Sequence, residues 1–112
     1  MTVVADSSPL VILAKISCFE FLNRLFPVLY ISTEVHHEVV VSGAGMPGAA
    51  EVARAKWIEV MQLQNQAELR AAQESHPLGV GELSTILLAK ELHANTVLLD
   101  DYNARKLAGG GE

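Results

Sequence analysis

Short apolar runs alternate with segments of helical periodicity along most of the chain. Runs rich in β-branched residues predict buried strands at 2–5, 28–31 and 96–99, and an alternating run at 58–63 predicts a strand with one solvent-facing side. Between these runs, helices are predicted over 7–26, 33–42, 49–57, 64–75, 81–94 and 100–107. Apolar residues at helical spacing indicate the helices at 7–26 and 81–94, and the polar, Ala-rich segment 64–75 is interpreted as a surface helix. Because strands and helices alternate, the predicted fold class is α/β with a mostly parallel sheet.

Helix boundaries are marked by capping and breaking residues. Asp6-Ser7-Ser8-Pro9 predicts the start of the first helix, with Ser7 or Ser8 as N-cap and Pro9 at the first helical position, and Pro27 ends this helix. Ser32 or Thr33 is expected to cap the second helix. The glycine-rich stretch 42–48 has neither a P-loop Lys-Ser pair nor a GxGxxG spacing, so it is interpreted as a connector.

Composition narrows the class of protein. The chain has 112 residues, of which 50% are hydrophobic, and its mean hydropathy is +0.27, so we expect one folded domain and exclude a disordered tail. No apolar run reaches the roughly 18 residues of a membrane span, and the start lacks the basic segment of a signal peptide, which predicts a cytoplasmic protein. The lone Cys18 excludes an intrachain disulfide and an all-cysteine zinc site.

The charge balance is acidic. Eight Lys and Arg residues against thirteen Asp and Glu residues give a formal net charge of −5. Proteins that bind nucleic acid through its backbone rely mainly on basic side chains. This balance therefore argues against such a function unless cations intervene.

Carboxylates follow two of the predicted strands directly. Asp6 comes after the first strand, and Asp100 and Asp101 come after the fourth. Open α/β sheets bind ligands at the carboxyl ends of their strands, and Mg²⁺ and Mn²⁺ prefer oxygen ligands, so these residues predict a metal site. Asp also caps helices well, so capping explains either position equally well. Glu38 and Glu82 extend the acidic set, although a solvated helix face and a helix-dipole partner explain them too.

Four segments together resemble PIN-domain proteins. They are Val4 to Lys15, which includes Asp6-Ser7-Ser8-Pro9, then EVHHEVV at 34–40, GVGELSTI at 79–86 and LLDDYNAR at 98–105. The order and spacing resemble most closely a prokaryotic branch related to VapC-type toxins, in which an Asp-Ser-Ser-Pro start is followed by a Gly-Glu pair and then by an Asp-Asp pair. The resemblance implies a PIN-like three-layer α/β/α sandwich whose mostly parallel sheet has four strands, or five with one truncated.

The resemblance also implies a metal-dependent ribonuclease that hydrolyses RNA with Mg²⁺ or Mn²⁺. Carried over by position, the catalytic and metal-binding residues are Asp6, Glu38, Glu82 and Asp101. Glu82 stands where many PIN proteins have aspartate. Asp100 is a further or alternate metal ligand, and Ser8 matches a hydroxyl residue that supports the site by hydrogen bonding.

The same resemblance shapes the expectations for domain and partners. Residues 1–112 are expected to form a single PIN-like domain that lacks the last strand and helix of the family, and an uncovered edge or apolar patch predicts a homodimer or a small antitoxin partner. The alternative function is a catalytically weak or inactive PIN-like module that acts through protein association. A response-regulator receiver ranks last, because no Asp follows the third predicted strand.

Overall fold

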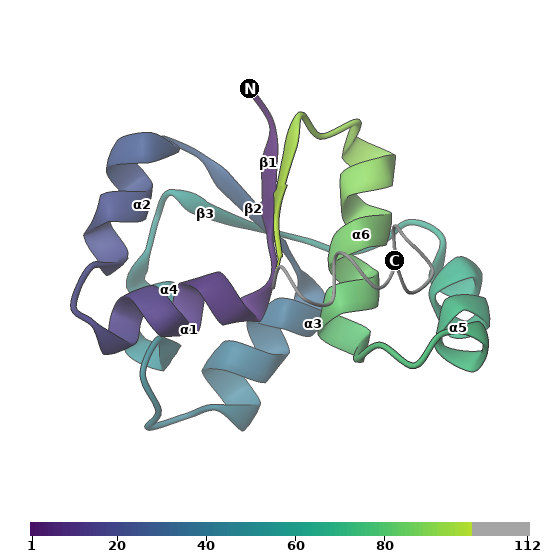
Figure 1. Ribbon diagram of the computed structural model, residues 1–112, viewed down its shortest axis with the longest axis horizontal. Coiled ribbons are helices and arrows are strands. Elements are labelled where there is room, and N and C mark those ends of the chain that lie inside the picture. The colour runs from purple at the N-terminus through teal and green to yellow at the C-terminus, as the bar shows by residue number, and fades with distance from the viewer. Residues whose placement is uncertain (100–112) are drawn as a thin grey trace, which may run out of the picture.

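Four parallel strands form the centre of the computed structural model, which describes residues 1–99 (Figure 1). In chain order the strands are β1 (Val3–Ala5), β2 (Leu29–Ser32), β3 (Ile58–Met61) and β4 (Thr96–Leu98). Their order in the sheet is β3-β2-β1-β4, and every pair is parallel. Val4 is in register with Val97 on β4 and with Tyr30 on β2.

Helices connect the strands and cover both faces of the sheet. They are α1 (Ser7–Lys15), α2 (Phe19–Leu25), α3 (Thr33–His36), the π-helix η1 (His37–Ser42), α4 (Ala49–Arg54), α5 (Gln66–Ser75) and α6 (Val80–Leu92). The predicted α/β class with a parallel sheet, and the PIN-like α/β/α layering, are confirmed.

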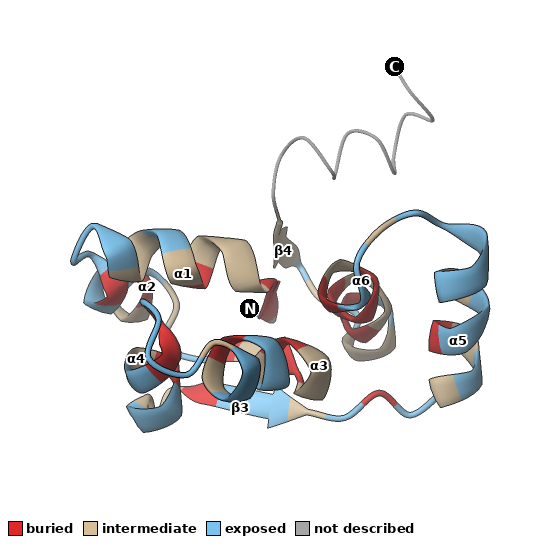
Figure 2. Cartoon of the chain, turned by 90° about the horizontal axis from the view of Figure 1, so that it is seen from below, coloured by how far each residue is buried: buried red, intermediate tan, exposed pale blue. Residues whose placement is uncertain are grey.

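The alternation of strand side chains divides the core into two clusters. Val3 and Ala5 face one side with Leu29 and Ile31, where α1, α2, η1 and α4 pack. Val4 faces the opposite side, where α6 packs on the sheet and α5 packs against α6 (Figures 1 and 2). Both faces of this parallel sheet are therefore buried, which explains why its inner strands read as continuous apolar runs.

The strand order places a switch point beside β1. From β1 the chain moves outward through β2 and β3 on one side, then returns to form β4 on the other. The backbone N–H of Asp6 donates to the carbonyl of Leu98 at 2.9 Å, so the carboxyl ends of β1 and β4 lie side by side. Ligand sites in open α/β sheets lie outside the carboxyl ends of the strands at such a point.

The first predicted helix is wrong in one respect, because residues 7–26 form two helices rather than one. Ser17 has φ 60°, its N–H donates to the carbonyl of Ala14 at 3.1 Å, and the N–H of Cys18 donates to that of Leu13 at 2.8 Å. These two bonds close α1 with a left-handed residue. The apolar residues of 19–26 keep helical spacing after the break, so periodicity alone does not reveal it.

The caps and the second helix also differ in detail from the expectation. Asp6, rather than Ser7 or Ser8, is the N-cap of α1, whereas Ser32 caps α3 as predicted by accepting from the N–H of Val35 at 3.0 Å. The predicted helix 33–42 is the short α-helix α3 followed by η1. The predicted strand at 58–63 ends at Met61. The helix expected at 100–107 lies outside the described residues.

Candidate active site

Asp6 lies at the carboxyl end of β1 and at the start of α1. Its side chain is 2% exposed, and its Oδ1 accepts a hydrogen bond from the N–H of Ser7 at 2.7 Å. The structure therefore confirms that Asp6 is a helix cap. A cap can be exposed to water, so capping alone does not explain why this carboxylate is buried at the switch point of the sheet.

The surroundings of Asp6 disfavour its charge. Burial raises the pKa of Asp6 to about 6, the Ser7 N–H opposes that shift, and the nearby charges of Glu82 and Glu38 add to it. Desolvation and like charges both penalise an ionised carboxylate. A cation placed among these side chains would relieve the penalty, and strongly shifted groups of this kind gather at functional sites.

Gly81 makes room for two carboxylates to converge. A Cβ on Gly81 would overlap Glu38 Oε1 and would come within 3.3 Å of Asp6 Oδ1. Asp6 and Glu38 therefore both direct an oxygen toward the space that a side chain would fill at this position. Gly81 itself is buried in the first turn of α6.

Buried hydroxyl groups fix the first turn of α6 against β2. Ser84 Oγ and Thr85 Oγ1 donate to the Gly81 carbonyl at 2.9 and 2.7 Å. Ser84 Oγ is also 2.7 Å from Ser32 Oγ, on the residue that caps α3. This network joins the helix that carries Gly81 to the strand end that leads to Glu38.

Glu38 and Glu82 approach Asp6 from different elements. Glu38 lies in η1, and short π-helical segments occur frequently at functional sites. Glu82 lies in the first turn of α6 and acts on Asp6 through its charge. Three segments far apart in sequence thus bring the predicted residues Asp6, Glu38 and Glu82 to one corner of the sheet.

The sequence predicts three further site residues, Asp100, Asp101 and Ser8. Asp100 and Asp101 lie outside the described residues, directly after Leu99. Within 1–99 the hydroxyl that contacts Asp6 belongs to Ser7, at 3.5 Å, and not to Ser8. The supporting role of Ser8 stays a prediction.

The sequence does not point to Gly81, Ser32, Ser84 or Thr85 as site residues. Gly81 and Ser84 belong to the segment GVGELSTI, but a glycine in a first helical turn and small polar residues on a helix have many ordinary explanations. Only the approach of Glu38 and Asp6 to Gly81 shows what its missing side chain permits.

The carboxylate oxygens of Asp6 and Glu38 are suitable ligands for a hard divalent cation. Mg²⁺ and Mn²⁺ take oxygen ligands, keep several waters and are often bound by one or two carboxylates, as Asp6 and Glu38 would supply. Within residues 1–99 no three histidine, cysteine or carboxylate side chains lie close enough together to hold a metal ion. The described part therefore provides a pair of converging ligands.

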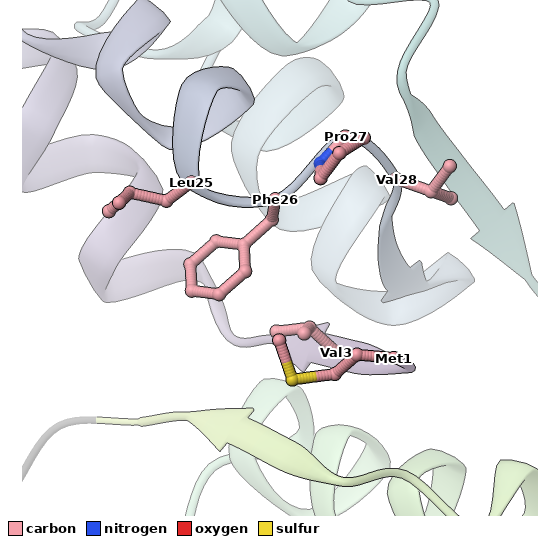
Figure 3. Close-up of a pocket in the computed structure, with 6 residues that line it drawn as sticks. All are labelled: Met1, Val3, Leu25, Phe26, Pro27 and Val28. Atoms are coloured by element: carbon pink, nitrogen blue, oxygen red, sulfur yellow. The ribbon is translucent and has the colours of Figure 1, made fainter.

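A cavity at the other end of the strands lacks charged side chains that could form such a site. It measures about 250 Å³ and lies near the amino ends of β1 and β2, where Met1, Val3 and residues 25–28 line it (Figure 3). None of these side chains is charged. We therefore place the candidate site at the carboxyl ends of the strands.

One comparison with known proteins agrees with this fold. The model of a family described as a PIN domain (DUF3368) matches residues 2–110. PIN domains are generally nucleases and typically use divalent metals. Neither the curated proteins nor the solved structures give a significant match. Among the described residues, no helix is both long and apolar enough to cross a membrane.

Proposed function

We propose that this chain, which belongs to the PIN-domain family, is a metal-dependent ribonuclease that hydrolyses single-stranded RNA with Mg²⁺ or Mn²⁺. The observation that carries the proposal is the convergence of the buried Asp6 with Glu38 over the missing side chain of Gly81. This pair lies at the switch point of a parallel sheet, where such folds bind ligands.

The ion would be held by Asp6 and Glu38, together with Asp101, with Asp100 as a further ligand and Glu82 contributing charge. A bound ion would supply positive charge to the phosphate and would activate a water molecule for hydrolysis. The chain's own residues prepare this site before substrate arrives. The Ser7 N–H fixes the Asp6 carboxylate, and the hydroxyl network fixes the turn at Gly81.

The acidic charge of the chain is consistent with this proposal. A net charge of −5 and the mutual repulsion of the carboxylates make the empty site unfavourable for a phosphate. The carboxylates instead favour a cation, and the cation then favours the phosphate. Substrate binding should therefore depend on the metal more steeply than in a basic nuclease.

The motif pattern further supports a toxin-type role with a small antitoxin partner. In this role, expression of the wild-type chain should arrest growth of a bacterial host, and Asp6→Ala should relieve the arrest. Equal growth with both chains would contradict the toxin role and leave the nuclease activity to be judged by cleavage in vitro.

The experiment that tests the nuclease is cleavage of a labelled single-stranded RNA with Mn²⁺ and with EDTA. Wild type should cleave only with Mn²⁺, and Asp6→Ala and Asp101→Ala should each remove most of that cleavage. Glu59→Gln, which changes an exposed carboxylate on β3, is the matched control and should cleave like wild type. The absence of Mn²⁺-dependent cleavage by wild type would overturn the proposal and favour an association module.

Glu82→Asp tests the role of Glu82, which stands where many PIN proteins have aspartate. The shorter side chain restores the aspartate common elsewhere but reduces its reach by one methylene. Retained cleavage would indicate that Glu82 acts through water or through its charge, and lost cleavage would indicate direct coordination.

A further inference from the structure

An open cavity adjoins the acidic site on the side of α1. It measures about 180 Å³ and includes Glu38 and Ser7 in its wall. Glu38 is one of the two carboxylates that converge at Gly81, and Ser7 follows Asp6 directly. A ligand at the acidic site could therefore extend into this cavity without leaving the surface of the protein.

One wall of the cavity is a single face of α1. Ser7, Val11 and Lys15 all line it, and their spacing of four residues places them on one side of the helix. At a rise of about 1.5 Å per residue, Lys15 lies roughly 12 Å along the helix from Ser7. The wall thus changes from polar near Asp6, through apolar at Val11, to cationic at its far end.

The opposite wall is formed by η1 and the glycine-rich loop 43–48, a stretch whose sequence predicts no more than a connector. Val39, Met46 and Pro47 supply its apolar surface. A Cβ on Gly43 would come within 2.7 Å of the Val39 carbonyl, so the loop approaches η1 as closely as only glycine allows. Gly48, with φ 98°, turns the chain back beside Val11. The loop is therefore the second side of a defined groove.

The groove holds a cation that has no partner in the described part of the chain. Lys15 is exposed, and within 1–99 the one ion pair joins Lys90 to Glu68 at 2.7 Å. In a chain of net charge −5, a lysine in the same groove as Glu38 is complementary to an anionic ligand that extends beyond the acidic site.

We infer that this groove is a nucleotide subsite for the single-stranded RNA substrate, an inference that rests on the proposed function. The base of the nucleotide beside the cleaved bond packs between Val11 of α1 and Val39 and Met46 opposite, and the next phosphate pairs with Lys15. A cavity of about 150 Å³ accepts a benzene ring, so about 180 Å³ suits one planar base. Apolar side chains can pack on the face of any of the four bases. The subsite therefore positions the RNA more than it selects a particular base.

The test measures KM and kcat for Mn²⁺-dependent cleavage of a fluorescent single-stranded oligoribonucleotide over a range of salt concentrations. Lys15→Ala should raise KM about tenfold with little change in kcat, and it should flatten the slope of log KM against log salt by about 0.7. The matched control is Lys56→Ala, an exposed lysine at the amino end of β3, which should change neither.

Met46 tests the apolar side of the subsite. Met46→Ala should raise KM several-fold, and Met46→Leu, which keeps the apolar surface, should restore it. If wild type cleaves RNA while Lys15→Ala and Lys56→Ala behave alike, the subsite is wrong and the proposed function stands. If wild type does not cleave RNA with Mn²⁺, the proposed function fails and the subsite with it.

Discussion

Asp6 combines a structural and a chemical role in one side chain. It caps α1 through the Ser7 N–H, and its burial and acidic neighbours raise its pKa to about 6. The same atoms that begin the helix therefore carry an unfavourable charge at neutral pH. A buried carboxylate whose charge destabilises the folded protein in this way is characteristic of functional sites.

The raised pKa predicts how stability depends on pH in the metal-free protein. Asp6 has an ordinary pKa of 3.8 and a folded-state value of about 6, so the folded state holds the proton more tightly. Its contribution is fully present below about pH 4 and is lost as pH rises through 6. Between pH 4 and 8 the free energy of unfolding of wild type should fall by at most about 3 kcal/mol relative to Asp6→Asn, which keeps a capping side chain.

Urea unfolding in EDTA at several pH values measures this difference. Glu59→Gln serves as the control, because it removes an exposed carboxylate. Its free energy of unfolding plotted against pH should stay parallel to that of wild type. Parallel curves for wild type and Asp6→Asn would contradict the raised pKa.

Gly81 provides a second prediction at the scale of one residue. Alanine favours helix by about 1 kcal/mol over glycine, so Gly81→Ala would be stabilising if only helix propensity mattered. Its Cβ instead overlaps Glu38 Oε1 and crowds Asp6, so we expect at least a tenfold loss of Mn²⁺-dependent cleavage in a folded protein.

Gly79→Ala is the matched control for Gly81→Ala. A Cβ on Gly79 meets its nearest atom, Glu82 Oε1, at 3.8 Å, which is ordinary contact. Circular dichroism establishes folding, and the two cleavage rates are then compared. Equal activity of the two variants would show that the space at Gly81 is not needed.

At the scale of elements, buried hydroxyls hold α6 against the end of β2. Ser84 bonds to both Ser32 and the Gly81 carbonyl. Ser84→Ala removes both bonds, while Ser32 keeps the N–H of Val35 as a donor. We expect urea unfolding to show a loss of about 1–2 kcal/mol.

The comparison for Ser84 is Ser75→Ala. Ser75 is exposed and donates to the Ala71 carbonyl within its own helix. Its loss should change the free energy of unfolding by less than about 0.5 kcal/mol. A similar small change for Ser84→Ala would mean that the network does not stabilise this corner.

Elements also show what can be predicted from the sequence. The strands can be located because helices bury their β-branched runs, and the motifs identify Asp6, Glu38 and Glu82, which the fold places near one another. The break at Ser17 and the π-helix at Glu38 are local changes of the backbone that leave the apolar spacing intact. The role of Gly81 cannot be predicted from the local sequence, because it arises from contacts between segments that are far apart in the chain.

On the scale of the whole molecule, apolar side chains remain exposed on the α1–α2 layer. The largest are Ile12, Ile16, Phe21 and Leu25, each more than half exposed. Such exposed apolar surface favours association. We predict a homodimer at tens of micromolar, roughly the range of ordinary protein affinities, when measured by light scattering.

A charge on this layer should disrupt the dimer without unfolding the chain. Phe21→Glu should move the scattering mass to that of a monomer, and Val60→Glu, on the exposed side of β3, should leave it unchanged. A wild-type monomer at these concentrations would count against association through this layer.

The central claim is that the acidic residues act as one metal-dependent unit that cleaves RNA. The most direct measurement is the Mn²⁺-dependent rate of single-stranded RNA cleavage for wild type, Asp6→Ala, Glu38→Ala and the double variant. Residues that act as a unit give strongly non-additive losses, so the double variant should be hardly slower than either single variant. Fully multiplicative losses, or a wild-type rate that EDTA does not change, would contradict the account.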